Sequence, residues 1–363
     1  MLKQFEVSGY KCFDEKIVLD FSDVRDYQFN TNCINDGFIG KMIIYGKNAI
    51  GKTVFSNALV DVGTHIGGNP RILINDFYYL NPSDLRKYAE FRYLFQFDNE
   101  QIEYIYRKED LQKPIYERVS INGELLFEYD KLHAERLNIS GLRKMSPTLI
   151  LNFSNVNSVL GYVVANTPLS PDSPLRKTID YIDRMFYTPV GDAGVVPQML
   201  FSTVFKDGGS LLEFENFLKD AGINVSLVML KDNDGKDRLY FNTSQPIPFD
   251  SVASSGTRTL YNLFIAYKLA GIKNTSLLVL DDFDAFYHFE LAEHIVKLLQ
   301  KLKSTQVVFT SHNTNLLSNR FMRPDCLFVM SKNNLVSLPN ATKRELREGH
   351  NLEKMYMSGE FDE

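Results

Sequence analysis

The chain has 363 residues, a formal net charge of −5 and 44% hydrophobic residues. This length suits one large domain with an insertion, or two domains. Because the net charge is negative, the protein has no overall positive field, and nucleic acid is not the default partner. A local basic patch that binds nucleic acid is still compatible with the sequence. No apolar run approaches the roughly 18 residues of a membrane span, and no secretory leader follows Met1. We therefore expect a cytoplasmic protein with no membrane partner.

The three cysteines, Cys12, Cys33 and Cys326, are far apart in the chain. None forms a Cys-x-x-Cys pair, which argues against a zinc site, and their number argues against a disulfide framework. We expect buried thiols in a reducing compartment.

The first third of the chain predicts mainly strands around one helix. Alternating runs separated by turn residues are typical of hairpins and of a β-meander. In chain order we expect strands at 4–7, 16–21 and 42–45, a helix at 54–62, a helix at 82–89, and strands at 90–97, 102–107, 116–121 and 124–129.

From residue 131 to residue 245 the pattern becomes mainly helical. We expect helices at 173–186 and 209–221, followed by a hairpin of 224–230 with 238–242. No heptad repeat persists, so a long coiled coil is not expected. This segment is interpreted as an insertion.

The last third returns to strands alternating with helices, a pattern that predicts a parallel sheet with helices on its faces. We expect helices at 254–270 and 289–303 and buried strands at 276–280, 306–310 and 326–331. The predicted organisation is an ATPase core of residues 1–130 and 246–363, interrupted by the insertion at 131–245.

A glycine-rich loop joins the strand at 42–45 to the following helix. It matches G-x-x-x-x-G-K-[ST] and consists of Gly46, Lys47, Asn48, Ala49, Ile50, Gly51, Lys52 and Thr53. Such a loop directs backbone N–H groups at a phosphate, while its lysine contacts the β- and γ-phosphates and its hydroxyl binds Mg²⁺. An ordinary glycine-rich turn is the alternative. The strand before the loop and the helix after it favour a nucleotide site.

Two acids, Asp281 and Asp282, follow the buried strand at 276–280. In a phosphate-loop ATPase the first acid at such a strand end holds Mg²⁺, and the second can polarise the attacking water. The alternative is that both acids cap the next helix through its dipole. We interpret Asp281 as the metal-side acid and Asp282 as the catalytic base.

Two further sites follow predicted strands or begin predicted helices, where a side chain or backbone N–H group can contact phosphate. His312 follows the strand at 306–310, where it could hydrogen-bond the γ-phosphate or its attacking water; a surface or capping histidine is the alternative. Ser254 and Gly256 begin a predicted helix, either as a simple cap or as a second anion site. One nucleotide cannot easily use two such sites from one chain, so a second subunit is the natural solution.

The order of these motifs resembles that of the ABC-type ATPases of the SMC, RecF and OLD group. In particular, the chain is similar to stand-alone bacterial AAA-family ATPases of anti-phage and abortive-infection systems. The resemblance covers residues 1–130 and 246–363, and it rests on residues 46–53, 254–257, 280–284 with His288, 310–313 and the tail 349–361.

The resemblance implies an α/β, RecF/SMC-like phosphate-loop fold with a mixed sheet, and it implies ATP and Mg²⁺ as cofactors. In that family Ser254 and Gly256 would contact the γ-phosphate bound to the other subunit, so a homodimer or higher homo-oligomer is expected. Asp281 and Asp282 would be the Walker B acids and His312 the switch histidine. Gln96 would be the Q-loop glutamine at the metal.

Two positions depart from the family pattern. Asp282 stands where ABC enzymes usually have a longer glutamate, so slow turnover is expected, and His288 occupies the place of the usual D-loop aspartate. The expected function is that of an ATPase subunit that controls a separate toxin or nuclease effector in phage defence. A RecF-like DNA-repair ATPase and a transporter subunit are the alternatives.

Overall fold

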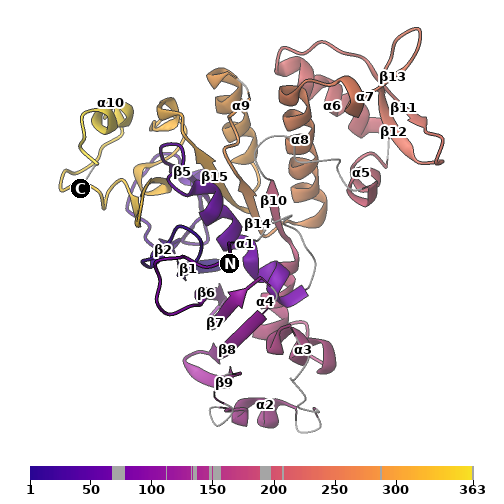
Figure 1. The fold of residues 1–363 in the computed structure, drawn as a ribbon. Coiled ribbons are helices and arrows are strands. Elements are labelled where there is room, and N and C mark those ends of the chain that lie inside the picture. The colour runs from indigo at the N-terminus through magenta and orange to yellow at the C-terminus, as the bar shows by residue number, and fades with distance from the viewer. Residues whose placement is uncertain are drawn as a thin grey trace.

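The computed structural model describes residues 1–67, 78–111, 113–131, 133, 137–146, 149, 157–188, 198–206, 208–286 and 288–361. Within these residues two large sheets and one helix between them organise the molecule (Figure 1). None of the helices in this part of the chain is both long and apolar enough to cross a membrane.

The central sheet has a parallel core. Its strands, in spatial order, are β10 (Met185–Thr188), β14 (Leu277–Leu280), β15 (Gln306–Ser311), β5 (Lys41–Tyr45), β16 (Leu327–Ser331) and β17 (Asn334–Ser337). The first five run parallel, and β17 pairs antiparallel with β16. Every residue of β5, β14 and β15 is buried, which explains their continuous apolar runs.

The second sheet is antiparallel. Its strands, in spatial order, are β2 (Ile17–Asp20), β1 (Leu2–Ser8), β6 (Ala89–Phe97), β7 (Glu100–Asp110), β8 (Lys113–Ile121) and β9 (Glu124–Asp130). Asn122 and Gly123 turn the β8–β9 hairpin with φ angles of 51° and 82°, as a two-residue hairpin loop requires. The predicted N-terminal meander is confirmed.

Helix α1 (Lys52–Gly67) lies between the two sheets. The Phe55 ring contacts that of Phe5 in β1 at 5.7 Å, and Tyr93 of β6 donates a hydrogen bond to the carbonyl oxygen of Ala58. On its other side α1 contacts β10 and β15 of the central sheet. The helix that carries the phosphate-loop lysine is therefore packed on both sides.

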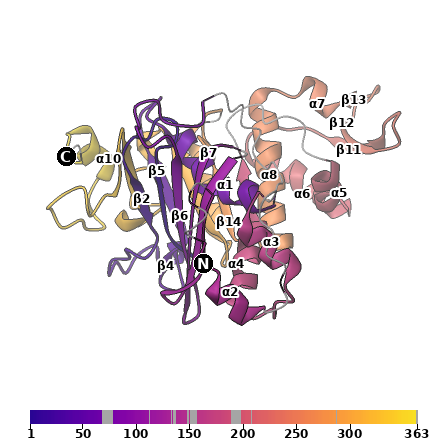
Figure 2. The ribbon, with the colours of Figure 1, turned by 60° about the horizontal axis from the view of Figure 1, so that its bottom comes forward.

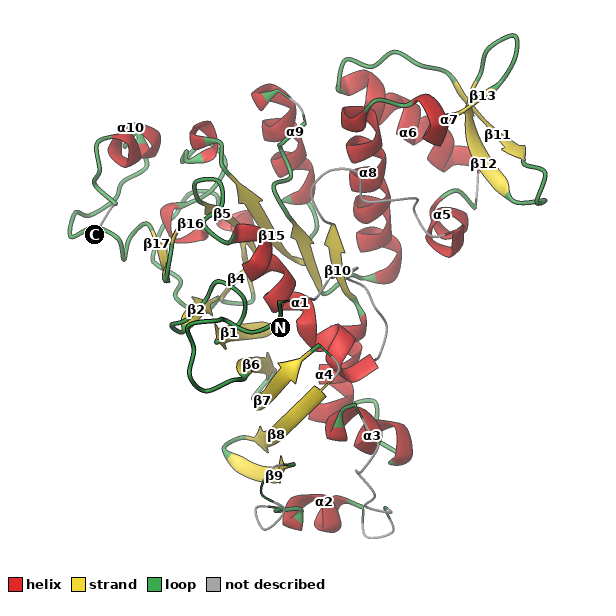
Figure 3. Cartoon of the chain, viewed as in Figure 1, coloured by secondary structure: helices red, strands yellow, loops and turns green. Residues whose placement is uncertain are grey.

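The remaining helices and small strands surround this core (Figure 3). They are α2 (Ser140–Met145), α3 (Val159–Asn166), α4 (Pro174–Asp183), α5 (Gln198–Val204), α6 (Gly208–Asp220), α7 (Phe249–Val252), α8 (Ser255–Lys273), α9 (Phe289–Leu299), α10 (Leu352–Met357), β3 (Ile34–Asn35), β4 (Phe38–Ile39), β11 (Leu227–Lys231), β12 (Asp237–Phe241), β13 (Ile247–Pro248) and the single 3-10 turns Thr31–Cys33, Thr314–Leu316 and Pro324–Cys326.

The predicted insertion divides into two parts. Helices α2, α3 and α4 pack against strands of the antiparallel sheet, whereas α5 and α6 pack against α8. The second part, with β11 to β13, forms an arm at one end of the molecule, and α10 lies at the other end (Figure 2).

The structure corrects three predictions. Residues 82–88 form turns instead of a helix, because the side chains of Asn81 and Asp84 accept hydrogen bonds from backbone N–H groups two residues ahead. The helix predicted at 173–186 ends at Asp183, and the following residues form β10 at the edge of the central sheet. Cys12 is exposed, while Cys33 and Cys326 are buried as expected.

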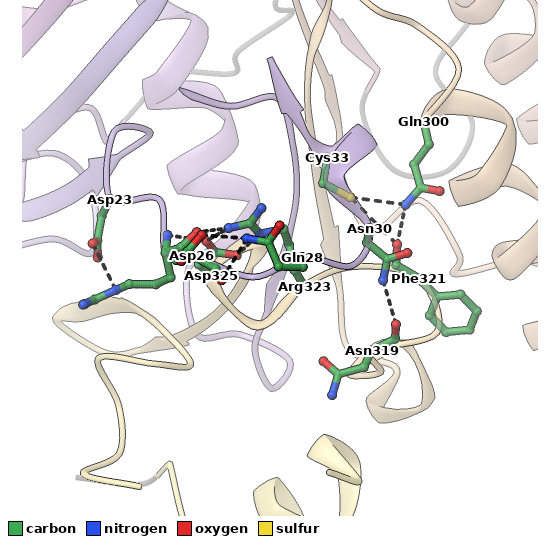
Figure 4. A network of polar contacts seen from close by, with 11 residues as sticks. Asp23, Asp26, Gln28, Asn30, Cys33, Gln300, Asn319, Phe321, Arg323 and Asp325 are labelled. Atoms are coloured by element: carbon green, nitrogen blue, oxygen red, sulfur yellow. Dashed lines mark hydrogen bonds and ion pairs between the residues drawn. The ribbon is translucent and has the colours of Figure 1, made fainter. Parts of the chain in front are cut away.

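A polar network fixes the loop before β5 to the C-terminal half of the chain (Figure 4). The backbone N–H of Arg25 donates to Asp325 Oδ2 at 2.7 Å, and Arg323 Nε donates to Asp325 Oδ1 at 2.7 Å. Asn30 Nδ2 donates to the carbonyl oxygen of Asn319 at 2.7 Å. The contacts of Arg25 and Asn30 join residues that lie about three hundred positions apart in the chain, and Arg323 holds Asp325 in place for the first of them.

A buried ion pair joins α1 to the antiparallel sheet. Lys108 Nζ lies 2.7 Å from Asp61 Oδ2, and both side chains are fully buried. Asp61 also accepts hydrogen bonds from the hydroxyls of Tyr106 (2.7 Å) and Tyr79 (3.4 Å).

We expect Lys108→Ala to lower the free energy of unfolding by about 3–5 kcal/mol, because it leaves the Asp61 carboxylate buried without its counter-charge. Urea unfolding measures this change. Lys297→Ala is the control, since its partner Glu293 forms a surface pair with a lysine side chain that is 54% exposed. That change should stay within about 0.5 kcal/mol. Equal effects of the two substitutions would contradict the role of the buried pair.

Candidate nucleotide site

The phosphate-binding loop connects β5 to α1 at the carboxyl edge of the central sheet. Gly51 has a φ of 111°, a conformation that residues with a Cβ rarely adopt, and a Cβ there would meet Cys12 Sγ at 3.0 Å. Lys52 is 4% exposed and donates hydrogen bonds to the carbonyl oxygens of Gly46 (2.9 Å) and Lys47 (3.3 Å). The loop thus folds around the lysine ammonium group.

Asp281 lies at the end of β14, facing the beginning of α1. Its Oδ1 accepts hydrogen bonds from the hydroxyls of Thr310 (2.7 Å) and Ser56 (3.2 Å), and it is only 2% exposed. Burial raises the pKa of Asp281, while the hydroxyls of Thr310, Thr53 and Ser56 act in the opposite direction. The carboxylate therefore joins three elements, α1, β14 and β15.

Asp282 occupies a strained position next to the phosphate loop. Its φ is 37°, in the left-handed region, and its backbone N–H donates to Thr310 Oγ1 at 2.7 Å. Its Oδ1 lies 3.4 Å from Lys52 Nζ and 3.8 Å from His312 Nδ1. The predicted base, the loop lysine and the predicted switch histidine thus meet within one chain.

The Asp281 carboxylate suits a hard cation. Its Oδ2 is buried and makes no hydrogen bond, and the Thr53 hydroxyl is near enough to lower its pKa. Mg²⁺ prefers oxygen ligands and usually takes one or two from the protein, with phosphate oxygens and water completing its shell. Asp281 and Thr53 therefore fit the predicted metal-side pair.

Ser254 and Gly256 lie apart from this cluster, at the N-terminus of α8. Ser254 caps the helix by accepting a hydrogen bond from the N–H of Thr257 at 3.2 Å. Both residues line a pocket of about 730 Å³ together with Phe286 and His288. In the described structure none of residues 46–53 lines that pocket. The two predicted phosphate-contacting parts are not brought together within one chain.

Gln96 does not lie at the site. The structure therefore corrects its interpretation as a Q-loop glutamine that binds the metal. Its backbone N–H donates to the carbonyl oxygen of Met1 at 2.8 Å, and its side chain donates to the carbonyl oxygen of Asp98. Residue 2 in turn bonds to Gln306, at the start of β15, whereas the site lies past the end of β15. Gln96 is thus linked, through Met1 and Leu2, to the start of β15, and Asp281 lies near the opposite end of that strand.

Several site neighbours escaped the sequence reasoning. Burial raises the pKa of Tyr187 of β10, and the nearby Asp281 carboxylate raises it further. The C-terminal tail also reaches the site, since the Tyr356 ring contacts Tyr45 at 4.6 Å and Thr314 donates to Glu353 at 2.8 Å. Tyr45 directly precedes the phosphate loop, so the tail contacts both its strand and the segment after His312.

The family model described as "AAA domain, putative AbiEii toxin, Type IV TA system" matches residues 41–318, which include the phosphate loop, both acids and His312. The chain belongs to this family. It is an AAA-family ATPase with a nucleotide-binding phosphate-loop fold, and the resemblance to abortive-infection AAA proteins is confirmed. No curated protein sequence matches it.

Solved structures similar to this AAA-family chain include SMC heads. The SMC head bound to the C-terminal winged-helix domain of ScpA aligns with a TM-score of 0.50 and 14% identity, covering 93% of this chain and 97% of that one. The SMC head domain from Thermotoga maritima aligns at 0.43 and 16%, covering 93% and 98%. The head with an extended coiled coil bound to a ScpA domain, from Pyrococcus furiosus, aligns at 0.44 and 13%, covering 93% and 96%. The predicted SMC-like α/β fold is confirmed.

We expect Lys52→Ala to abolish measurable ATP binding without unfolding the AAA-family chain, because its ammonium group contacts loop carbonyls and Asp282 instead of apolar core. Titration with a fluorescent ATP analogue and thermal unfolding should be measured on the same preparation. Lys301→Ala, an exposed lysine beyond α9, is the control. Unchanged ATP affinity in Lys52→Ala would refute the phosphate-loop assignment.

Proposed function

We propose that this chain binds and slowly hydrolyses ATP as a head-to-tail dimer, and that closure of the dimer controls a separate effector protein. One observation carries the proposal. Lys52, Asp282 and His312 meet at one point of the sheet edge, with distances of 3.4 and 3.8 Å from the Asp282 carboxylate. A lysine for phosphate, a base for water and a second proton-bearing group are the parts that phosphoryl transfer to water needs.

Each group has a defined task in hydrolysis. Lys52 and the loop N–H groups bind the β- and γ-phosphates, and Thr53 with Asp281 would hold Mg²⁺, whose charge offsets that of the phosphates. Asp282 accepts a hydrogen bond from the attacking water and aims it at the γ-phosphorus. His312 donates a hydrogen bond to a γ-phosphate oxygen.

Asp282 explains why turnover should be slow. Aspartate is one methylene shorter than the glutamate usual at this place, and its carboxylate already lies near Lys52. The lysine must exchange this carboxylate for phosphate when ATP binds. The left-handed backbone of Asp282 also changes the direction in which its short side chain leaves the strand end.

The dimer follows from the separation of the two phosphate-contacting parts. The α8 N-terminus presents a positive dipole end to a pocket, and none of the described residues of the chain's own phosphate loop lines that pocket. A second copy placed head to tail would bring each α8 N-terminus to the other copy's γ-phosphate. ATP would then stabilise the dimer by mass action.

A role in phage defence is supported by the family description, which names a putative toxin and a toxin–antitoxin system. We propose that the effector is a separate toxin or nuclease polypeptide. A RecF-like DNA-repair ATPase is the alternative, and stimulation of ATP hydrolysis by DNA would favour it.

Asp282→Ala should bind ATP at least as tightly as the original chain, because it removes a carboxylate 3.4 Å from the phosphate-binding ammonium. Its hydrolysis rate should fall on the order of 10²- to 10³-fold, or about 3–4 kcal/mol in activation free energy. Single-turnover phosphate release measures this rate. Asp282→Glu, which keeps the carboxylate, should hydrolyse ATP no more slowly than the original chain. Hydrolysis at the original rate in Asp282→Ala would show that another group is the base.

Mixing two inactive variants tests the composite site. Lys52→Ala lacks the phosphate-loop lysine, and Gly256→Arg blocks the α8 N-terminus, where a Cβ already meets the Phe286 carbonyl oxygen at 3.1 Å. Each variant should be inactive alone. A mixture should recover ATPase activity, since the heterodimer contains one site with an intact loop from one chain and an intact α8 N-terminus from the other.

Sedimentation with ATP and with ADP is the companion measurement. Rescue together with an ATP-dependent increase in size supports the proposal. A mixture that stays inactive although both chains are folded, with no change of size in ATP, would rule out the head-to-tail dimer.

A further inference from the structure

The segment that follows β14 stays joined to the last two residues of β15. Thr310 Oγ1 donates to Asp281 and accepts from the N–H of Asp282, and the N–H of Phe283 donates to the carbonyl oxygen of Thr310 at 3.2 Å. Ser311 Oγ then donates to Asp284 Oδ2 at 2.8 Å. Each residue of 281–284 therefore contacts Thr310 or Ser311, the two residues before His312.

Asp284 is the last carboxylate in this series, and the hydrolysis mechanism leaves it without a task. Its side chain is buried, with the residue 7% exposed, and its Oδ1 makes no hydrogen bond. Ser311, whose hydroxyl donates to Asp284, in turn accepts from the N–H of Asn313 at 2.9 Å. The carboxylate thus holds the backbone on both sides of His312 through one serine hydroxyl.

His312 itself has little other support. Its side chain is 44% exposed, and its closest charged partner, Asp282 Oδ1, is 3.8 Å away, which is too long for a hydrogen bond. The backbone angles of His312 set the direction in which its ring leaves the strand end and the rotamers that are open to it. The hydrogen bonds of the Ser311 hydroxyl with Asp284 and with the N–H of Asn313 fix this backbone.

We propose that Asp284 is a positioning residue that acts through Ser311 to aim His312 at the γ-phosphate. This inference rests on the proposed ATPase function and assigns a role within the same site. A buried carboxylate oxygen without a hydrogen-bond partner lowers the stability of the folded state. Burial raises the pKa of Asp284, and hydrogen bonds from Ser311 and from its own backbone, followed by His312 and Asn313, act in the opposite direction, so the surroundings of this carboxylate include residues 311–313.

A double-mutant cycle separates positioning from general structural support. Asp284→Asn and Ser311→Ala should each lower kcat by about 10- to 100-fold, since a misplacement of 1 Å near the chemistry can have effects on the order of 10². The affinity for a non-hydrolysable ATP analogue should stay unchanged in both. In a His312→Ala background neither change should lower kcat further, because the group they position is gone.

Ser337→Ala is the matched control for Ser311→Ala. Ser337 is also a buried serine of the central sheet, but it lies on β17, away from the site. It should retain the original kcat in both backgrounds. An unchanged kcat in Asp284→Asn, or an equal fold loss with and without His312, would overturn the positioning role.

A measurement that needs no ATP hydrolysis distinguishes this inference from the proposed function. The chain has six histidines, so labelling with ¹⁵N-histidine gives few ring signals, and the His312 signals are identified by their loss in His312→Ala. Asp284→Asn and Ser311→Ala should shift or broaden them, and Ser337→Ala should not. If the original chain proves unable to hydrolyse ATP, the proposed function fails, while these spectra still decide the inference. His312 signals unchanged in both variants would refute it.

Discussion

The rest of the site depends on the hydrogen bonds that the buried Asp281 carboxylate accepts. It is buried at the end of β14 and accepts hydrogen bonds from hydroxyls on α1 and β15, so it fixes the phosphate-loop helix against two strands. Its second oxygen has no hydrogen-bond partner. An unsatisfied buried carboxylate oxygen is unfavourable, and a cation bound there would remove that penalty. The same group therefore stabilises the site's framework and predisposes it to bind metal.

Much of this site could be predicted from sequence because parallel strands end at one edge of their sheet. Once residues 276–280 and 306–310 are interpreted as buried parallel strands, the acids after the first and the histidine after the second must lie near the phosphate loop. The pairing of β15 with both β14 and β5 confirms that reasoning. Helix α8 was likewise predicted within a few residues, because Ser254 is a strong N-cap.

The failures have equally specific causes. Residues 185–188 continue the apolar pattern of α4, so periodicity alone could not show that they form strand β10 with Tyr187 facing Asp281. Only the family resemblance places Gln96 at the metal, with no spacing rule to test it, and the structure has this residue on β6 of the antiparallel sheet, paired with Gln101. The task proposed for Asp284 was invisible because it depends on a serine hydroxyl twenty-seven residues away in the chain.

The position of β5 has a consequence for how the protein is made. This strand pairs with β15 on one side and β16 on the other, so the loop that follows it has no complete framework until Ser331 has left the ribosome. At about 5–20 residues per second, the interval between synthesis of Tyr45 and of Ser331 is roughly 15–60 s. During that time the nascent chain carries an apolar strand without its neighbours, which makes it a natural client for a chaperone. The order of strands in the sheet thus delays nucleotide binding until β16 has been translated.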